Sequence, residues 1–206
     1  MTQNNADDIA DFGFRSVPRE EKSTLVREVF DSVAGKYDIM NDLMSLGIHR
    51  LWKREFLTAL DPRPYHKLLD LAAGTGDITF GWLKRGGGPV VMSDINDSML
   101  NVGRDRATAN GHLADIEFLV TDAEAIPLPD ASFDRISMAF GLRNCTNKDK
   151  VIAEAQRLLR PGGRFMVLEF SQLQIAGLER LYDAWSFQAL PKIGGIIAKD
   201  PSLIHI

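Results

Sequence analysis

The stretch Lys67-Leu-Leu-Asp-Leu-Ala-Ala-Gly-Thr-Gly-Asp77 runs from an apolar segment through two glycines into a helical pattern. The apolar run begins at Leu68, and the helical pattern begins at Asp77. This order predicts a buried parallel strand, a tight glycine turn and a helix start. Gly74 and Gly76 have no Cβ, so the backbone there can come close to a ligand. A plain strand-to-helix turn, with no ligand, is the alternative interpretation.

The glycine turn departs from a dinucleotide-binding turn in two ways. Thr79 stands where the third glycine of the dinucleotide fingerprint is expected. Asp77 places a carboxylate in the first helical turn, where a pyrophosphate needs the positive field of the helix. Both features count against a nicotinamide-dependent oxidoreductase and favour a cationic ligand without phosphate. S-adenosylmethionine, with its sulfonium and ammonium groups, is such a ligand, and the turn resembles the first motif of class I methyltransferases.

Two further apolar runs end in acids. The run from Pro89 ends at Asp94, at the position where such folds hold a ribose with a carboxylate. Hydrogen bonds from ribose hydroxyls to a charged acceptor contribute roughly 1.5–3 kcal/mol each. The run from Ile116 ends at Asp122 and Ala123, which resembles the methyltransferase position that contacts the adenine. Three strand ends therefore predict one cofactor site.

Strands and helices alternate after the glycine turn. The alternation predicts a Rossmann-like α/β fold with a mostly parallel, doubly wound sheet and its ligand at the carboxyl ends of the strands. We expect one methyltransferase domain over residues 1–206, built of four parts. These are a mobile leader (1–20), a helical lid over the carboxyl edge (21–64), a βα core (65–171), and a helix with a tail (172–206).

Composition narrows the classes of partner. The net charge of −4 predicts no nucleic-acid partner. Cys145 is the only cysteine, which excludes an internal disulfide, and no Cys/His cluster has the spacing of a metal site. The polar, acidic amino terminus has no secretory or organelle signal, and no apolar stretch is long enough to span a membrane. We therefore expect a cytoplasmic protein.

Three longer motifs resemble the UbiE family, the C-methyltransferases of ubiquinone and menaquinone biosynthesis. The likeness covers Phe12 to about Asp200. It rests on Tyr37-Asp-Ile-Met-Asn-Asp-Leu-Met-Ser45 with His49 and Trp52-Lys53, on Phe140-Gly-Leu-Arg-Asn144, and on Arg157-Leu-Leu-Arg-Pro-Gly-Gly-Arg-Phe-Met-Val-Leu-Glu169-Phe-Ser171. The resemblance implies S-adenosylmethionine as cofactor and a prenylated quinol as substrate, either a benzoquinol or a demethylmenaquinol.

The resemblance also implies where the cofactor is held. Carried over by position, Thr75, Asp94, Asp122 and Ala123 contact S-adenosylmethionine, beside the two glycines of the turn. Some family members place a further contact at a serine, but Ala139 stands at that position here. Asp70 is expected either to reach the ammonium group through water or simply to cap the turn.

Catalysis needs an electron-rich ring, so a phenol hydroxyl must lose or share its proton. Arg143 is the candidate for stabilising the phenolate, because it should lie at a strand end. A loop arginine paired with a carboxylate is the alternative. His49 and Tyr37 are candidate general bases on the lid, and each is equally well explained as a structural contact. Trp52, Phe56, Met40 and Met44 are expected to line an isoprenoid channel or, more simply, to pack between helices.

The carboxyl-terminal residues 201–206 depart from the family pattern. Members continue past this point, so we expect the closing strands of the sheet to be missing and the strand Phe165–Phe170 to form an open edge. An open edge favours a homodimer or a complex of quinone biosynthesis. Trp185 and Phe187 are candidates for contact with the membrane or, more simply, for covering the sheet. The rival function is a catalytically impaired homologue that binds the cofactor or acts as a scaffold.

Overall fold

The computed structural model describes residues 9–12, 15–18, 21–22, 24 and 47–169. The chain divides into two compact units. One unit comprises residues 1–49 and 170–206, and the other comprises residues 50–169. Tyr37, Met40, Met44 and the predicted carboxyl-terminal helix and tail lie outside the described residues.

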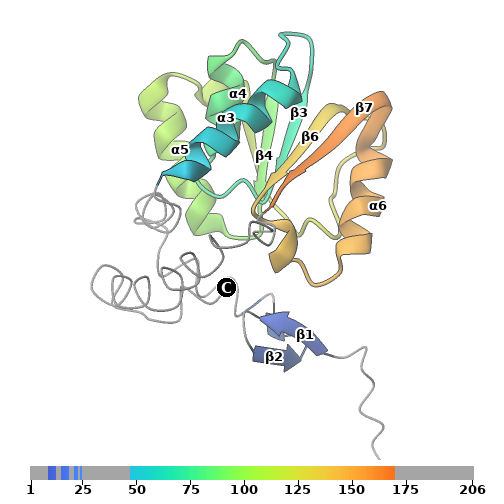
Figure 1. The fold of residues 1–206 in the computed structure, drawn as a ribbon. Helices are drawn as coiled ribbons and strands as arrows, with labels where there is room; N and C mark the ends of the chain where they lie inside the picture. The colour runs from blue at the N-terminus through green and yellow to red at the C-terminus, as the bar shows by residue number, and fades with distance from the viewer. Residues whose placement is uncertain (1–8, 13–14, 19–20, 23, 25–46, 170–206) are drawn as a thin grey trace, which may run out of the picture. The chain divides into compact units, whose positions relative to one another are not determined.

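The first unit contains a hairpin of two short strands (Figure 1). Strand β1 (Ile9–Phe12) pairs antiparallel with β2 (Arg15–Pro18). This differs from the leader expected over residues 1–20. Residues of the Ile, Phe and Val type favour strands, and pairing the two segments satisfies backbone groups that would otherwise depend on water.

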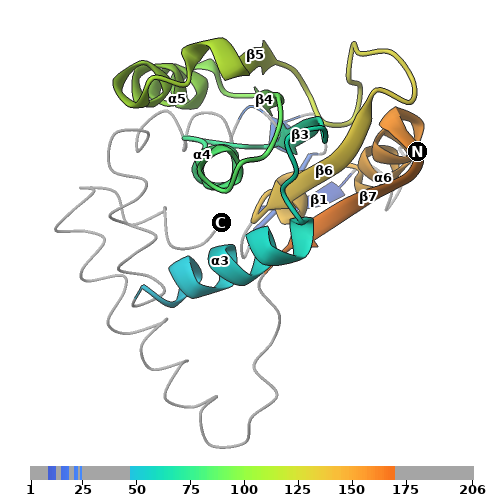
Figure 2. The same ribbon diagram turned by 90° about the horizontal axis from the view of Figure 1, so that it is seen from above.

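The second unit is a five-stranded parallel sheet in the order β5-β4-β3-β6-β7 (Figure 2). The strands are β3 (Leu68–Leu71), β4 (Val90–Asp94), β5 (Ile116–Val120), β6 (Phe133–Ala139) and β7 (Leu159–Leu168). All four residues of the central strand β3 are buried, because helices cover both faces of the sheet. The Rossmann-like methyltransferase fold predicted from the sequence is confirmed.

Three helices cover one face of the sheet and a fourth covers the other (Figure 2). Helices α3 (Ile48–Leu60), α4 (Asp77–Lys84) and α5 (Asp97–Asn110) share the first face, and α6 (Lys148–Leu158) packs on the second. The short 3₁₀ helices η3 (Leu113–Asp115) and η4 (Leu142–Asn144) complete the connections. Asn96 and Asn147 cap α5 and α6 through side-chain hydrogen bonds, as their positions in the sequence predict.

Helix α3 is a layer of the core, and this corrects the lid expected over residues 21–64 for the part that the structure describes. Phe56, Leu57 and Leu60 are buried against β3 and α4, beside Leu68 and Trp82. The helix buries this apolar stripe because its large side chains recur three and four residues apart. Phe56 is therefore a packing residue, as the simpler of its two interpretations predicted.

Strand β7 begins at Leu159, six residues before the start expected at Phe165. It follows α6 directly at Leu159 and includes Pro161 and two glycines, with a shift of register against β6 between the pairs of Phe133 and Arg135. A bulge accommodates the proline and the glycines, residues that ordinarily interrupt a strand. Among the described strands, β7 and β5 lie at the two ends of the sheet. None of the helices that the structure describes has the length and apolar character to cross a membrane.

Candidate cofactor site

The glycine turn connects β3 to α4 at the carboxyl edge of the sheet. Its backbone is left-handed at three positions, with φ of 50° at Ala72, 58° at Gly74 and 92° at Gly76. The amide of Ala73 donates to the carbonyl of Ser93 in β4, and the amide of Gly76 donates to the carbonyl of Ala73. The first hydrogen bond joins the turn to β4, and the second stabilises the turn internally.

Gly76 is required by packing. A Cβ at this position would lie 2.9 Å from Cε2 of Phe80 and 3.0 Å from Cε of Met92. A Cβ at Gly74 would meet Cε of Met99 at 3.2 Å. These contacts give the glycines a packing role, because the protein's own side chains fill the space that a Cβ would need. Close approach of a ligand to the turn stays a prediction.

Asp94 ends β4 and joins the glycine turn to the start of α5. Its Oδ2 accepts a hydrogen bond of 2.8 Å from the amide of Gly74, and its Oδ1 accepts one of 2.9 Å from the amide of Asn96. Burial raises the pKa of Asp94 above its ordinary value, although the backbone amides that it binds oppose the shift. The amide of Ile95 is a third donor to this carboxylate, and its acceptance of ribose hydroxyls stays a prediction.

Asp122 and Ala123 follow the next strand at the same edge. The amide of Thr121 donates to the carbonyl of Asp94, which holds the end of β5 beside the end of β4. Asp122 is exposed, and its Oδ1 accepts from the amide of Glu124. Ala123 packs against the core cluster on the α6 face. The topology therefore brings these two residues and Asp94 to adjoining strand ends, as predicted.

Asp70 turns into the protein rather than toward a ligand. Its carboxylate is 1% exposed. Oδ2 accepts from the amide and hydroxyl of Thr79, at 3.1 and 2.7 Å, and Oδ1 accepts from the hydroxyl of Ser137. Of its two expected roles, the cap is the one that the geometry supports, because the amide of Thr79 belongs to the first turn of α4. Burial is the main cause that raises the pKa of Asp70 to about 6.

Two basic side chains hold Thr75 and Asp77, and no role was predicted for either of them from the sequence. Arg106 of α5 donates to the carbonyl and hydroxyl oxygens of Thr75 and to Oδ1 of Asp77, and Lys53 of α3 donates to Oδ2 of Asp77 at 2.6 Å. Because these two cations compensate its charge, Asp77 repels a pyrophosphate less than its position in the sequence suggests. Only the packing of three helices brings these residues together, so no local motif could have revealed them.

Arg143 lies in η4, just beyond the end of β6. Its amide donates to Oε1 of Glu169 at 3.2 Å, and its guanidinium Nη1 lies 3.8 Å from Oε2 of the same residue. The expected strand-end position is confirmed, and a carboxylate partner is present, as the alternative interpretation required. His49 is buried in the first turn of α3. It belongs to the unit formed by residues 1–49 and 170–206, and its role as a base stays a prediction.

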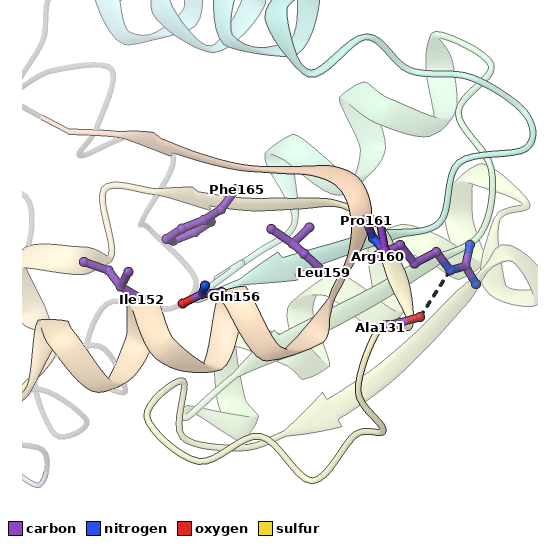
Figure 3. Close-up of a pocket in the computed structure, with 7 residues that line it drawn as sticks. All are labelled: Ala131, Ile152, Gln156, Leu159, Arg160, Pro161 and Phe165. Atoms are coloured by element: carbon purple, nitrogen blue, oxygen red, sulfur yellow. Dashed lines mark hydrogen bonds between the residues drawn. The ribbon is translucent and has the colours of Figure 1, made fainter.

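An apolar depression of about 540 Å³ lies elsewhere on the sheet (Figure 3). It is formed by α6, the beginning of β7 and Ala131, with Phe165 among its lining residues. Because Leu159, Arg160 and Pro161 open β7, the depression lies toward the amino ends of the strands. No carboxylate lines it. The described residues also hold no cluster of His, Cys, Asp and Glu suited to a metal ion.

A parallel sheet with a glycine turn after its central strand and acids at the next two strand ends defines a Rossmann-like fold of the methyltransferase type. Solved structures share this fold. The [4+2]-cyclase SpnF superposes with a TM-score of 0.60 at 21% identity, over 74% of this chain and 62% of that chain. A SAM-dependent methyltransferase from Aquifex aeolicus superposes with a TM-score of 0.54 at 23% identity, over 69% of this chain and 78% of that chain.

Sequence comparison identifies the family. Residues 17–203 match the ubiE/COQ5 methyltransferase family, and the chain belongs to it. It is 65% identical over 190 residues to the ubiquinone/menaquinone biosynthesis C-methyltransferase UbiE of Acidiphilium cryptum, covering 92% of this chain and 76% of that protein. It is 54% identical to the UbiE protein of Hydrogenovibrio crunogenus, with the same coverage. The chain is therefore a methyltransferase, and its family implies S-adenosylmethionine as cofactor.

Proposed function

We propose that the chain transfers a methyl group from S-adenosylmethionine to a ring carbon of a prenylated quinol, a precursor of ubiquinone or menaquinone. The observation that carries the proposal is the meeting of Gly74, Asp94 and Asp122 at one edge of the sheet, in a chain of the ubiE/COQ5 family. Its relatives are named as C-methyltransferases of these two pathways. The family assignment favours this function over that of a catalytically impaired scaffold.

The residues at this edge of the sheet suit a positively charged nucleoside as ligand. S-adenosylmethionine, when bound, supplies a methyl group on a positively charged sulfur. The carboxylate of Asp94 is the acceptor that we propose for the ribose hydroxyls. Asp122 and Ala123 lie beside it for the adenine, and Thr75 is held rigidly in the turn. An acidic site also suits a ligand whose sulfonium and ammonium groups are positive.

The reaction requires little covalent chemistry from the protein. A carbon–carbon bond forms between the ring and the methyl group, the carbon–sulfur bond breaks, and the ring carbon gives up its proton. Holding the two reacting carbons in line contributes about 7–11 kcal/mol. A base that shares the phenol proton adds roughly 10²–10⁴-fold. We propose Arg143 for the phenolate, and His49 or Tyr37 for the base.

The substrate also suggests partners. A polyprenyl tail stays in a bilayer, so we propose that the protein works at the cytoplasmic surface of the membrane that holds its substrate. A second copy of the chain, or other proteins of quinone biosynthesis, are further proposed partners. Flotation with vesicles that contain the quinol, compared with vesicles that lack it, tests the membrane contact.

The decisive experiment is transfer of a labelled methyl group from S-adenosylmethionine to demethylated quinols of both types. Labelled product from either quinol supports the proposal and identifies the pathway. Cofactor binding without transfer to any quinol would leave only the scaffold function. Competition between a nicotinamide dinucleotide and S-adenosylmethionine would instead support the oxidoreductase hypothesis.

A pair of variants tests the cofactor site. Asp94→Asn should weaken S-adenosylmethionine binding by about 10–100-fold, since charge-assisted hydrogen bonds of roughly 1.5–3 kcal/mol are lost. Asp97→Asn is the matched control. Asp97 lies three residues away in the first turn of α5, and its side chain is mostly exposed beside Arg104. Equal calorimetric affinities for the two variants would remove Asp94 from the site.

A further inference from the structure

Arg106 holds the glycine turn at three points. Its Nη1 donates to the carbonyl oxygen of Thr75 at 2.9 Å and to the hydroxyl oxygen of Thr75 at 3.0 Å. Its Nη2 donates to Oδ1 of Asp77 at 3.0 Å. Its guanidinium lies 4.8 Å from the ring centroid of Phe80, the side chain that fills the space beside Gly76. One side chain from α5 thus contacts the turn and the first part of α4.

Asp77 connects this contact to a third helix. Its second oxygen accepts from Nζ of Lys53 in α3, so one carboxylate joins two cations from different helices. The side chains of Lys53 and Asp77 are only 14% and 29% exposed. Burial alone would raise the pKa of Asp77, but the charges and hydrogen bonds of Lys53 and Arg106 outweigh it and hold the pKa below its ordinary value. The carboxylate therefore stays charged at neutral pH.

The turn needs such support because its backbone is unfavourable. Ala72 adopts a left-handed φ of 50°, which costs a residue with a Cβ some conformational energy. Thr75 lies between the two left-handed glycines, and both its carbonyl and its hydroxyl accept from Arg106. A guanidinium suits this role because its planar fork offers several donors in fixed directions. A lysine offers a single point of charge.

We propose that Arg106 is a positioning residue that preorganises the glycine turn for the cofactor, with Asp77 and Lys53 as the charges that fix it. The proposal rests on the proposed function, because it assigns Thr75 and the turn to cofactor binding. Arg106 acts through the turn and does not touch the reacting atoms. When only a fraction of molecules has the binding-competent turn, the apparent Kd rises by the inverse of that fraction.

A matched pair of variants on one helix tests the proposal. Arg104 is also on α5 and also lies over a ring, with its guanidinium 4.9 Å from the centroid of Phe118. It bonds to Asn101 and lies near Asp97 within its own helix, and it makes none of the contacts with the turn. Arg106→Met and Arg104→Met therefore remove the same charge and the same kind of ring contact, but only the first releases the turn.

Arg106→Met should raise the Kd and the KM for S-adenosylmethionine about tenfold, with kcat at saturating cofactor little changed. Arg104→Met should change neither. Arg106→Lys should recover part of the affinity, and it serves as the test if the methionine variant does not fold. An unchanged Kd in both Arg106 variants, with a binding wild type, would overturn the proposal. A fall in kcat with unchanged KM would also overturn it, since it would place Arg106 at the chemical step.

Hydrogen exchange in the free protein separates this proposal from the proposed function. The amide of Gly76, which donates within the turn, should exchange faster in Arg106→Met than in Arg104→Met. This holds whether or not the cofactor binds. A wild type that does not bind S-adenosylmethionine would therefore contradict the proposed function, while faster exchange at Gly76 would still show that Arg106 orders the turn. Equal exchange rates at Gly76 in the two variants would contradict the positioning role of Arg106 alone.

Discussion

The hydroxyl of Ser137 donates a 2.7 Å hydrogen bond to Oδ1 of Asp70, and this bond ties the end of β3 to β6 across 67 residues of chain. The other oxygen of the same carboxylate binds the amide and hydroxyl of Thr79 in α4. A charged side chain in the most buried part of the sheet is costly, and three donors offset that cost only in part. The position therefore stabilises the arrangement of the turn while leaving a pH-sensitive group inside it.

The first prediction concerns stability against pH. The folded-state pKa of Asp70, about 6, exceeds its unfolded value of 3.8, so the folded protein binds the proton more tightly. Linkage then makes the contribution of Asp70 to stability largest below the unfolded value and removes it as pH rises through about 6. Between pH 5 and 7.5 the wild type should lose about 1–1.5 kcal/mol relative to Asp70→Asn, whose amide does not titrate.

Urea denaturation of both proteins at the two pH values measures this difference. Asn can present its oxygen to Thr79 and its amide to the oxygen of Ser137, so the variant should fold. Parallel pH profiles for the wild type and the variant would show that Asp70 does not titrate in this range.

The second prediction concerns the glycine turn. Gly76→Ala should destabilise the protein by about 2–4 kcal/mol, because the new Cβ is strained at φ 92° and meets Phe80 and Met92. Gly86→Ala is the control. Gly86 has a left-handed φ of 77° but nothing within 4 Å of a Cβ, so it should cost only about 1–2 kcal/mol. Equal unfolding midpoints in urea would show that the contacts at Gly76 do not matter.

The third prediction concerns catalysis. Arg143→Ala should lower kcat about a hundredfold while the Kd for S-adenosylmethionine stays within about twofold, because its contact forms with the developing phenolate. Arg160→Ala is a remote control, since Arg160 opens β7 and pairs with Asp134. Steady-state kinetics with calorimetry distinguishes the outcomes. A parallel loss of affinity would make Arg143 part of the cofactor site, and no loss would make it a surface partner of Glu169.

The fourth prediction concerns Arg157, which fastens the loop before β6 to α6. Its guanidinium donates to both carboxylate oxygens of Glu154, to Asp130, and to the carbonyls of Ile126 and Leu128. Hydrogen bonds to Glu154 and Asp130 raise the pKa of Arg157 above its ordinary value. Arg157→Lys should cost about 1–2 kcal/mol in urea denaturation, because a single ammonium cannot reach these acceptors together.

Arg160→Lys is the matched control for this fourth variant. Arg160 is about half-exposed, and a lysine at this position can form the same ion pair with Asp134. The change should cost under about 0.5 kcal/mol. A loss at Arg157→Lys no greater than that at Arg160→Lys would show that the five hydrogen bonds contribute little.

Local sequence patterns were sufficient to predict most strands of the parallel sheet. Buried parallel strands have continuous apolar runs, so the runs predicted from Leu68, Pro89 and Ile116 correspond to β3, β4 and β5, and each strand begins within one residue of its predicted start. The caps at Asn96 and Asn147 were predicted because such a cap involves only residues three apart. The early start of β7 was missed, since proline and glycine ordinarily end a strand and only pairing with β6 keeps them in it.

The sequence by itself determined the fold class, the family and the edge at which Asp94 and Asp122 meet, because strand order and strand-end residues follow from patterns along the chain. The tertiary structure decided which partner each of the key side chains contacts. Asp70 turns inward to Ser137, α3 packs on the sheet, and Arg106 reaches across α4 to Thr75. These relationships join residues from separate elements, and their energies depend on burial and distance, which arise only when the helices pack on the sheet.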